Sequence, residues 1–177
     1  MISQPRFMVD HNVGKLARWL RLMGYDAVFF TGQDDQQMVT AALAEGRIVL
    51  TRDTRIMERR VVTSGRLKAM LIRSDRPEVQ LRQLVAACHL DSQLHPFTRC
   101  LECNQPLAAR TREEVKGRVP PYVYRTQGQY MECPGCHRLY WRGSHWQRMT
   151  ERLARLGDDA GGLRGHGDEQ GAAGGVD

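Results

Sequence analysis

Residues 47–53, Arg47-Ile48-Val49-Leu50-Thr51-Arg52-Asp53, have the pattern of a strand buried inside a parallel sheet. An apolar run of Ile, Val and Leu ends abruptly in a polar triplet that closes on a carboxylate. Buried parallel strands are near-continuous apolar runs, and ligands bind beyond their C-terminal ends. The stretch therefore predicts a core strand with Asp53 at the functional edge of the sheet.

Working outward from this strand, apolar runs and helix-like patterns alternate along the first half of the chain. Further strands are predicted at 7–9, 27–30 and 69–72, and helices at 13–23, 36–44, 54–62 and 78–88. Strands that alternate with helices form parallel sheets with right-handed crossovers. The sequence thus predicts an α/β domain over 1–95.

Acidic residues follow several of these strands. Asp10, Asp53 and Asp75 come after predicted strands, and Asp34-Asp35 opens a helix at the same edge. Clustered carboxylates repel each other unless cations hold them, and Mg²⁺ or Mn²⁺ prefer such oxygen ligands. The alternative is that each Asp only caps a helix, for which Asp is a favoured residue.

A carboxylate-held divalent ion suits hydrolysis of phosphodiester bonds. Lys15, Arg18 and Arg52 are predicted near the same edge, where they can hold flanking phosphates. Their alternative role is to form a solvated helix face.

Four cysteines mark a second module over 96–157. Cys100, Cys103, Cys133 and Cys136 form two CxxC pairs, the pattern of a structural Zn²⁺ site. The position after each second Cys, Asn104 or His137, often needs a positive φ. Between the pairs we expect a hairpin built from segments near Val115 and Tyr130. A haem-attachment motif, a redox pair, or a His ligand in place of one Cys are weaker alternatives.

Composition limits where the protein works and what it binds. The net charge is +6, and a basic chain favours a polyanionic partner such as nucleic acid. The chain shows no apolar signal segment or membrane span, so we expect a cytoplasmic protein. A helix is predicted at 145–156. Residues 158–177, rich in Gly, are expected to be a disordered tail.

Several of these motifs together resemble the Mut-seven C-terminal RNase family. The resemblance lies in Asp10, residues 14–21, 24–26, 46–53 and 74–75, and in the segments around both CxxC pairs, and it spans roughly residues 6–150. It implies a PIN-like α/β fold with a C-terminal zinc ribbon, and divalent-metal-dependent RNase activity. By position, the family's acidic residues match Asp10, Asp53 and Asp75, with Asp35 rather than Asp34 as the helix-opening acid.

Two main hypotheses of function follow. The first is a ribonuclease that binds Mg²⁺ or Mn²⁺ through Asp10, Asp35, Asp53 and Asp75, with Zn²⁺ on the four cysteines and RNA held by the basic ribbon. The second is a zinc-ribbon protein that binds nucleic acid without cleaving it. A phosphoacceptor domain with Asp53 as nucleophile fits less well, because His11 stands where a second acid is needed.

Overall fold

A four-stranded parallel sheet forms the centre of the first half of the chain. In this computed structural model, which describes residues 4–91, 95 and 97–161, the strands are β1 (Phe7–Val9), β2 (Ala27–Phe29), β3 (Ile48–Thr51) and β4 (Ala69–Leu71). They lie in the order β2-β1-β3-β4, and every neighbouring pair is parallel. The predicted α/β class and all four predicted strands are confirmed.

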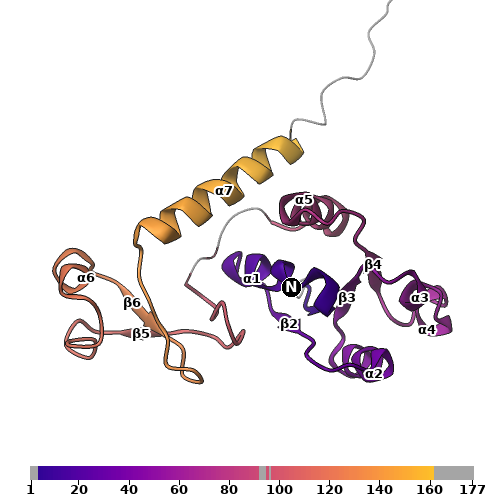
Figure 1. Cartoon of the computed structure of the whole chain (residues 1–177), viewed down its shortest axis with the longest axis horizontal. Coiled ribbons are helices and arrows are strands. Elements are labelled where there is room, and N and C mark those ends of the chain that lie inside the picture. The colour runs from indigo at the N-terminus through magenta and orange to yellow at the C-terminus, as the bar shows by residue number, and fades with distance from the viewer. Residues whose placement is uncertain (1–3, 92–94, 96, 162–177) are drawn as a thin grey trace, which may run out of the picture.

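Helices cover both faces of this sheet (Figure 1). Helices α1 (Lys15–Leu22) and α5 (Pro77–Cys88) pack on one face, and α2 (Asp35–Glu45) and α3 (Thr54–Met57) on the other. Strand β1 shows the alternation, since Phe7 and Val9 join the core with α1 and α5 while Met8 joins the core with α2 and α3. Because both faces are covered, the strands are apolar throughout, as the sequence indicated.

The strand order reverses between β1 and β3. The chain moves outward from β1 to β2 through α1, then crosses back to β3 and continues outward to β4 on the other side. The two halves therefore diverge at the C-terminal ends of β1 and β3. Open α/β sheets bind ligands at such a point, because the loops separate there and leave a crevice.

Three helices differ from their predicted bounds by more than one residue. The segment predicted as one helix over 54–62 is two short helices, α3 and α4 (Arg60–Thr63), because Arg59 has extended backbone angles between them. The helix predicted over 13–23 is a 3-10 turn η1 (His11–Val13) followed by α1. The last helix, α7 (Ser144–Gly161), continues past Gly157, where its end was predicted, since one helical Gly costs only about 1 kcal/mol. Part of the predicted tail is thus helical, and residues 162–177 lie outside the described residues.

The second half of the chain contains a small antiparallel sheet of β5 (Ala108–Arg110), β6 (Tyr130–Glu132) and β7 (Leu139–Tyr140), with helix α6 (Pro121–Thr126). The partner of β6 in the hairpin is Ala108–Arg110 and not the segment near Val115. Val115 is instead buried under the turn and packs with Val119, Val123 and Tyr130 in a separate apolar cluster. Its burial, rather than strand pairing, explains the apolar residue there.

The two halves pack against each other. Leu153 of α7 and Leu101 of the first CxxC loop belong to the same buried core as α1 and α5. The buried Arg21 on α1 donates hydrogen bonds to the carbonyls of Ala27, Leu101 and Glu102 at 2.8, 2.9 and 2.8 Å. Among the described residues no helix is long and apolar enough to cross a bilayer.

Candidate functional site

Asp10 lies at the reversal point, directly after β1, and is 2% exposed. Its carboxylate accepts hydrogen bonds from Thr51 Oγ1 at 2.6 Å and Asn12 Nδ2 at 2.9 Å, and His11 Nδ1 lies 2.7 Å from the other oxygen. It caps nothing, because η1 has no side-chain cap hydrogen bond. Within the described part of the chain it has no Arg or Lys partner. A buried carboxylate without such a partner is costly, and a bound cation would offset that cost.

Asp53 is tied to Asp10 through Thr51. The Asp53 backbone N–H donates to Thr51 Oγ1 at 3.0 Å, while the Thr51 hydroxyl donates to Asp10. The Arg52 backbone N–H donates to Asn12 Oδ1 at 3.0 Å, which joins the two loops a second time. The ends of β1 and β3 are therefore held together by side chains from both loops.

Asp53 also caps α3 and pairs with a cation. Its carboxylate accepts the Arg55 backbone N–H at 2.9 Å and lies 2.8 Å from Arg55 Nη2. The Arg55 guanidinium and its backbone N–H hold the pKa of the Asp53 carboxyl below its usual value. Helix capping, the alternative role expected for each Asp, is therefore confirmed at Asp53, and it does not exclude a role in binding a metal.

The two acids at the start of α2 differ in what they do. The Asp34 side chain caps the helix by accepting the Gln36 N–H at 2.8 Å. Asp35 is the first helical residue and lies close enough to Arg55 to help Asp53 raise the pKa of that guanidinium. Asp35 and Asp53 therefore both act on the Arg55 guanidinium, and the choice of Asp35 over Asp34 as the acid of the site stays a prediction.

Among the residues that the structure describes, Asp75 has no contact that ties it to the other acids. It is exposed in the loop after β4 and makes no hydrogen bond or ion pair with the described residues. No three of these carboxylates lie close enough together to hold one metal ion. In the described chain, the four cysteines are the only group of three or more His, Cys, Asp or Glu whose ligand atoms lie within 4.8 Å of one another. The metal role of Asp10, Asp35, Asp53 and Asp75 stays a prediction.

The three basic residues predicted near this edge are all exposed. Lys15 begins α1, and Arg18 lies one turn further, where Nη1 is 2.6 Å from Glu102 Oε1 of the first CxxC loop. Arg52 lies between β3 and α3. Their contact with nucleic acid is likewise untested, and Arg18 already has an acidic partner.

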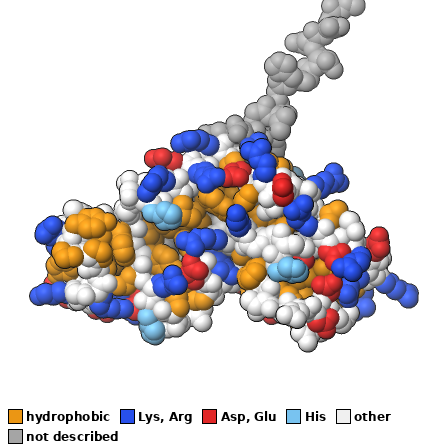
Figure 2. Space-filling view, in the orientation of Figure 1, with side chains coloured by type: hydrophobic (Ala, Val, Ile, Leu, Met, Phe, Trp, Pro, Cys, Tyr) orange, Lys and Arg blue, Asp and Glu red, His pale blue; other side chains and the backbone are white. Residues whose placement is uncertain are grey.

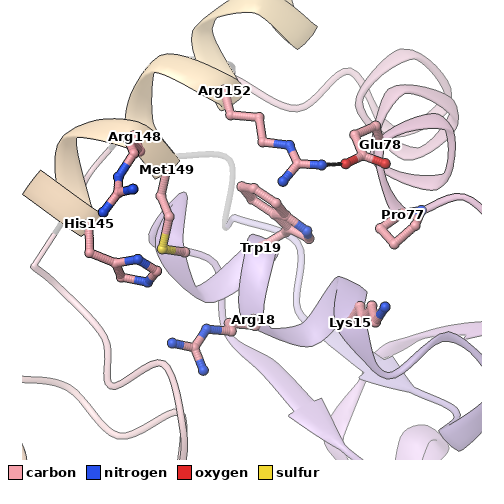
Figure 3. Close-up of a pocket in the computed structure, with 9 residues that line it drawn as sticks. All are labelled: Lys15, Arg18, Trp19, Pro77, Glu78, His145, Arg148, Met149 and Arg152. Atoms are coloured by element: carbon pink, nitrogen blue, oxygen red, sulfur yellow. Dashed lines mark ion pairs between the residues drawn. The ribbon is translucent and has the colours of Figure 1, made fainter.

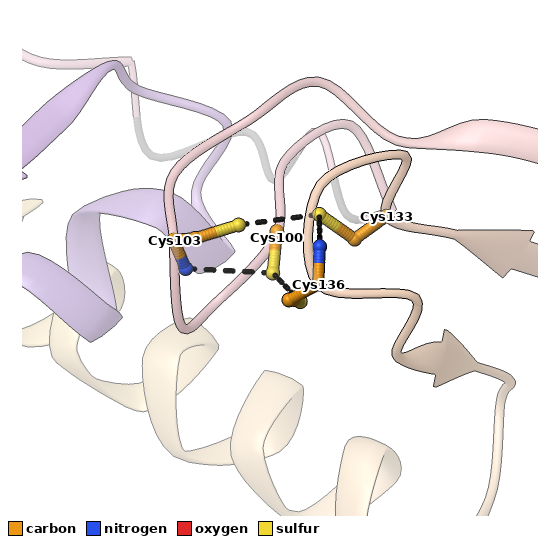
Figure 4. A group of neighbouring side chains, drawn as sticks. All are labelled: Cys100, Cys103, Cys133 and Cys136. Atoms are coloured by element: carbon orange, nitrogen blue, oxygen red, sulfur yellow. Dashed lines mark hydrogen bonds between the residues drawn. The ribbon is translucent and has the colours of Figure 1, made fainter.

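The four cysteine sulfurs form a compact group (Figure 4). Cys103 Sγ lies 3.2 Å from Cys133 Sγ, and Cys100 Sγ lies 3.6 Å from Cys136 Sγ. Both separations are too long for a disulfide and close to the roughly 3.8 Å edge of a tetrahedron with Zn–S bonds of about 2.3 Å. The position after each second Cys has a positive φ, 68° at Asn104 and 59° at His137, as the CxxC pattern predicted. The group fits one tetrahedral metal ion such as Zn²⁺.

The pKa values of the cysteine thiols also favour a bound cation at this group. Burial opposes ionisation of Cys100, but the Tyr140 hydroxyl and backbone N–H groups outweigh it and lower the pKa of Cys100 to about 6. Burial and the neighbouring thiols raise the pKa of Cys103 to about 12. Without a cation the group therefore ionises unevenly, whereas Zn²⁺ stabilises all four thiolates together.

Comparison with known families agrees with this architecture. The model of the Mut7-C RNAse domain matches residues 5–153, and the chain belongs to that family. The match covers both the parallel sheet and the cysteine module, and it points to a nuclease-like function. No curated protein and no solved structure matches the chain.

Sequence reasoning missed the residues that support the acids. Thr51, Asn12 and Arg55 all contact Asp10 or Asp53. Thr51 is the last residue of β3 and Asn12 stands two residues after Asp10, so both positions could be read from the sequence. Nothing in the sequence paired them across 39 residues, because that pairing depends on β1 lying beside β3.

Proposed function

We propose that the protein is a metal-dependent ribonuclease that hydrolyses phosphodiester bonds at the edge formed by Asp10, Asp35 and Asp53, with Asp75 as an outer acid. The observation that carries this proposal is Asp10: a carboxylate 2% exposed, at the reversal point of the sheet, with neither a capping role nor an Arg or Lys partner among the described residues. Membership of the Mut7-C RNAse domain family supports the reaction class.

Oxygen donors at this edge fit Mg²⁺ or Mn²⁺. A bound ion of this kind lowers the pKa of a water and offsets negative charge on the phosphate. The chain contributes orientation: Thr51 and Asn12 use one Asp10 oxygen and leave the other to His11, whose side chain is 71% exposed and free to move. Asp53 must exchange Arg55 for the ion, and Arg55, with its side chain 83% exposed, can turn into solvent.

Structural Zn²⁺ is proposed on the four cysteines, and RNA as the polyanionic substrate. A reducing compartment such as the cytoplasm suits zinc thiolates, which oxidants convert to disulfides. We propose no protein partner.

Cleavage of labelled single-stranded RNA in Mg²⁺ or Mn²⁺ tests the proposal. Asp10→Asn, Asp35→Asn and Asp53→Asn are expected to lower the rate by at least about 100-fold, as loss of one key polar group in an active site does. Asp34→Asn is the matched control, because Asn also caps helices and should leave the rate unchanged.

Equal activity in the wild type and all Asp variants would overturn the catalytic assignment. RNA binding that needs no divalent ion, and that strengthens when the acids are removed, would instead favour a binding protein that does not cleave. An independent arm measures Mn²⁺ affinity by calorimetry: Arg55→Ala removes the competitor for Asp53 and should raise the affinity severalfold, by a local ion-pair effect.

A further inference from the structure

A cavity of about 790 Å³ lies where α7 crosses over α1 and the start of α5. Its walls come from both halves of the chain (Figure 3). Helix α1 provides Lys15, Arg18 and Trp19, α7 provides His145, Arg148, Met149 and Arg152, and α5 provides Pro77 and Glu78. A volume of this size is typical of ligand-binding clefts.

The lining is strongly cationic. Four Lys or Arg side chains face one carboxylate, that of Glu78. The positions follow helix geometry, since Lys15 and Arg18 are three residues apart on α1 and Arg148 and Arg152 four apart on α7. Figure 2 shows Lys and Arg side chains gathered on the surface over α7. Two helices thus turn basic faces toward a shared space.

Two of these cations are unneutralised. Arg152 pairs with Glu78, and Arg18 pairs with Glu102. Lys15 and Arg148 have no carboxylate partner in the described residues, and both are exposed. Like charges around one cavity are unfavourable without an anion, so the site favours an anionic ligand.

The cavity also has an apolar part. Trp19 and Met149 are partly buried against the main core and border the cavity. The Arg152 guanidinium lies 5.7 Å from the Trp19 ring centroid, where its ion pair with Glu78 holds it. Aromatic and apolar surface beside cations is the combination that binds single-stranded nucleic acids, through their bases and phosphates together.

The place of the cavity in the fold connects it to the acidic edge. Lys15 starts α1 five residues after Asp10, and Pro77 starts α5 two residues after Asp75. In a parallel α/β sheet, helix starts lie at the C-terminal edge of the strands. The cavity therefore opens beside the edge that carries the acids.

We propose that this cavity binds single-stranded RNA outside the cleaved bond, with Lys15 and Arg148, at opposite ends of the cavity (Figure 3), each holding a different phosphate, and with Trp19 and Met149 contacting a base between them. The proposal rests on the proposed function in taking RNA as the ligand. Helix α7 then has a role in binding substrate, in addition to its packing role. Bases stacked inside a duplex cannot enter such a cavity, so a single strand is required.

Fluorescence anisotropy with a fluorescein-labelled oligouridylate tests this on the full zinc-loaded chain, without Mg²⁺ or Mn²⁺, so that binding is measured apart from cleavage. Lys15→Ala and Arg148→Ala should each weaken binding roughly tenfold, as expected for loss of a hydrogen bond to a charged group. Each should also lower the slope of log affinity against log salt by about 0.7. Arg148→Lys keeps the charge and should retain most of the affinity.

Arg66→Ala is the matched control. Arg66 is exposed and precedes β4, at the opposite edge of the sheet, so its loss removes the same charge away from the cavity. Three results would each refute the proposed RNA site. These are wild-type affinity in Lys15→Ala and Arg148→Ala, an equal loss of affinity in Arg66→Ala, or equally tight binding of the labelled strand after it is annealed to its complement. If Lys15→Ala and Arg148→Ala weaken RNA binding but the wild type cleaves no RNA, the binding site in the cavity is supported and the proposed ribonuclease activity is refuted.

Discussion

Replacing Thr51 with Val tests whether the hydroxyl at the end of β3 holds the two acids together. Thr51 is fully buried, its hydroxyl donates to Asp10 at 2.6 Å, and it accepts the Asp53 N–H at 3.0 Å. Val has nearly the same shape, so the change removes these two hydrogen bonds, a longer one from Asn12 Nδ2 at 3.5 Å, and little packing. A bond to a charged group contributes about 1.5–3 kcal/mol and a neutral one about 0.5–1.5 kcal/mol.

We therefore expect Thr51→Val to lower the free energy of unfolding by about 2–4 kcal/mol. For a chain of this length that corresponds to a fall in Tm of roughly 5–15 °C. Urea unfolding of the zinc-loaded protein, followed by circular dichroism, should show a lower midpoint with an unchanged slope.

Thr40→Val provides the control. Thr40 is exposed on α2, and its hydroxyl donates to the Gln36 carbonyl at 2.8 Å within the same helix. Its replacement should change stability by no more than about 0.5 kcal/mol. If Thr51→Val is as stable as this control, the hydroxyl does not support the acids, and the account of how Asp10 and Asp53 are positioned is wrong.

Two further perturbations separate the cysteine module from the sheet. Removing zinc, either with a chelator or by Cys133→Ser, should unfold the three-stranded sheet, because a structural zinc site contributes about 10–16 kcal/mol. It should also lower the Tm of the parallel sheet, because Arg21 loses its carbonyl acceptors at Leu101 and Glu102. Hydrogen exchange, measured residue by residue, resolves both effects. Arg118 and Arg110 lower the pKa of Glu132 from 4.5 to about 2, so its ion pairs stabilise the fold above pH 4.5, and that contribution is lost as the pH falls from about 4.5 toward 2. The difference in urea midpoint between the wild type and Glu132→Gln should shrink over that range, and a constant difference would contradict the ion-pair explanation.

The parallel sheet and the cysteine module were both predictable from local sequence patterns. Apolar runs such as Ile48-Val49-Leu50 predict strands because helices bury both faces of the parallel sheet, where polar side chains are unfavourable. Two CxxC pairs predict one metal group because each knuckle is a local structure, and the four sulfurs do lie within 4.8 Å of one another. The hairpin was placed wrongly, since Val115 is apolar for burial under a turn and not for pairing.

The acidic edge was predictable only in part. Strand ends placed Asp10 and Asp53 at one edge, but their difference in environment depends on neighbours distant in sequence. Asp10 is buried beside Thr51, whereas Asp53 caps α3 and pairs with Arg55. A sequence pattern gives the position of a carboxylate along the chain, while its partners follow from strand order.

Sequence alone determined the strands of the parallel sheet, the strand ends that carry Asp10 and Asp53, and the zinc-type cysteine quartet, because each depends on contacts within a few residues. Only the tertiary structure decided that β1 lies beside β3, which joins Asp10 to Asp53 through Thr51. It also decided that α7 crosses α1, which places Arg148 and Lys15 on the walls of one cavity. Both results depend on packing between segments far apart in the chain, where burial of shared apolar surface selects the neighbours.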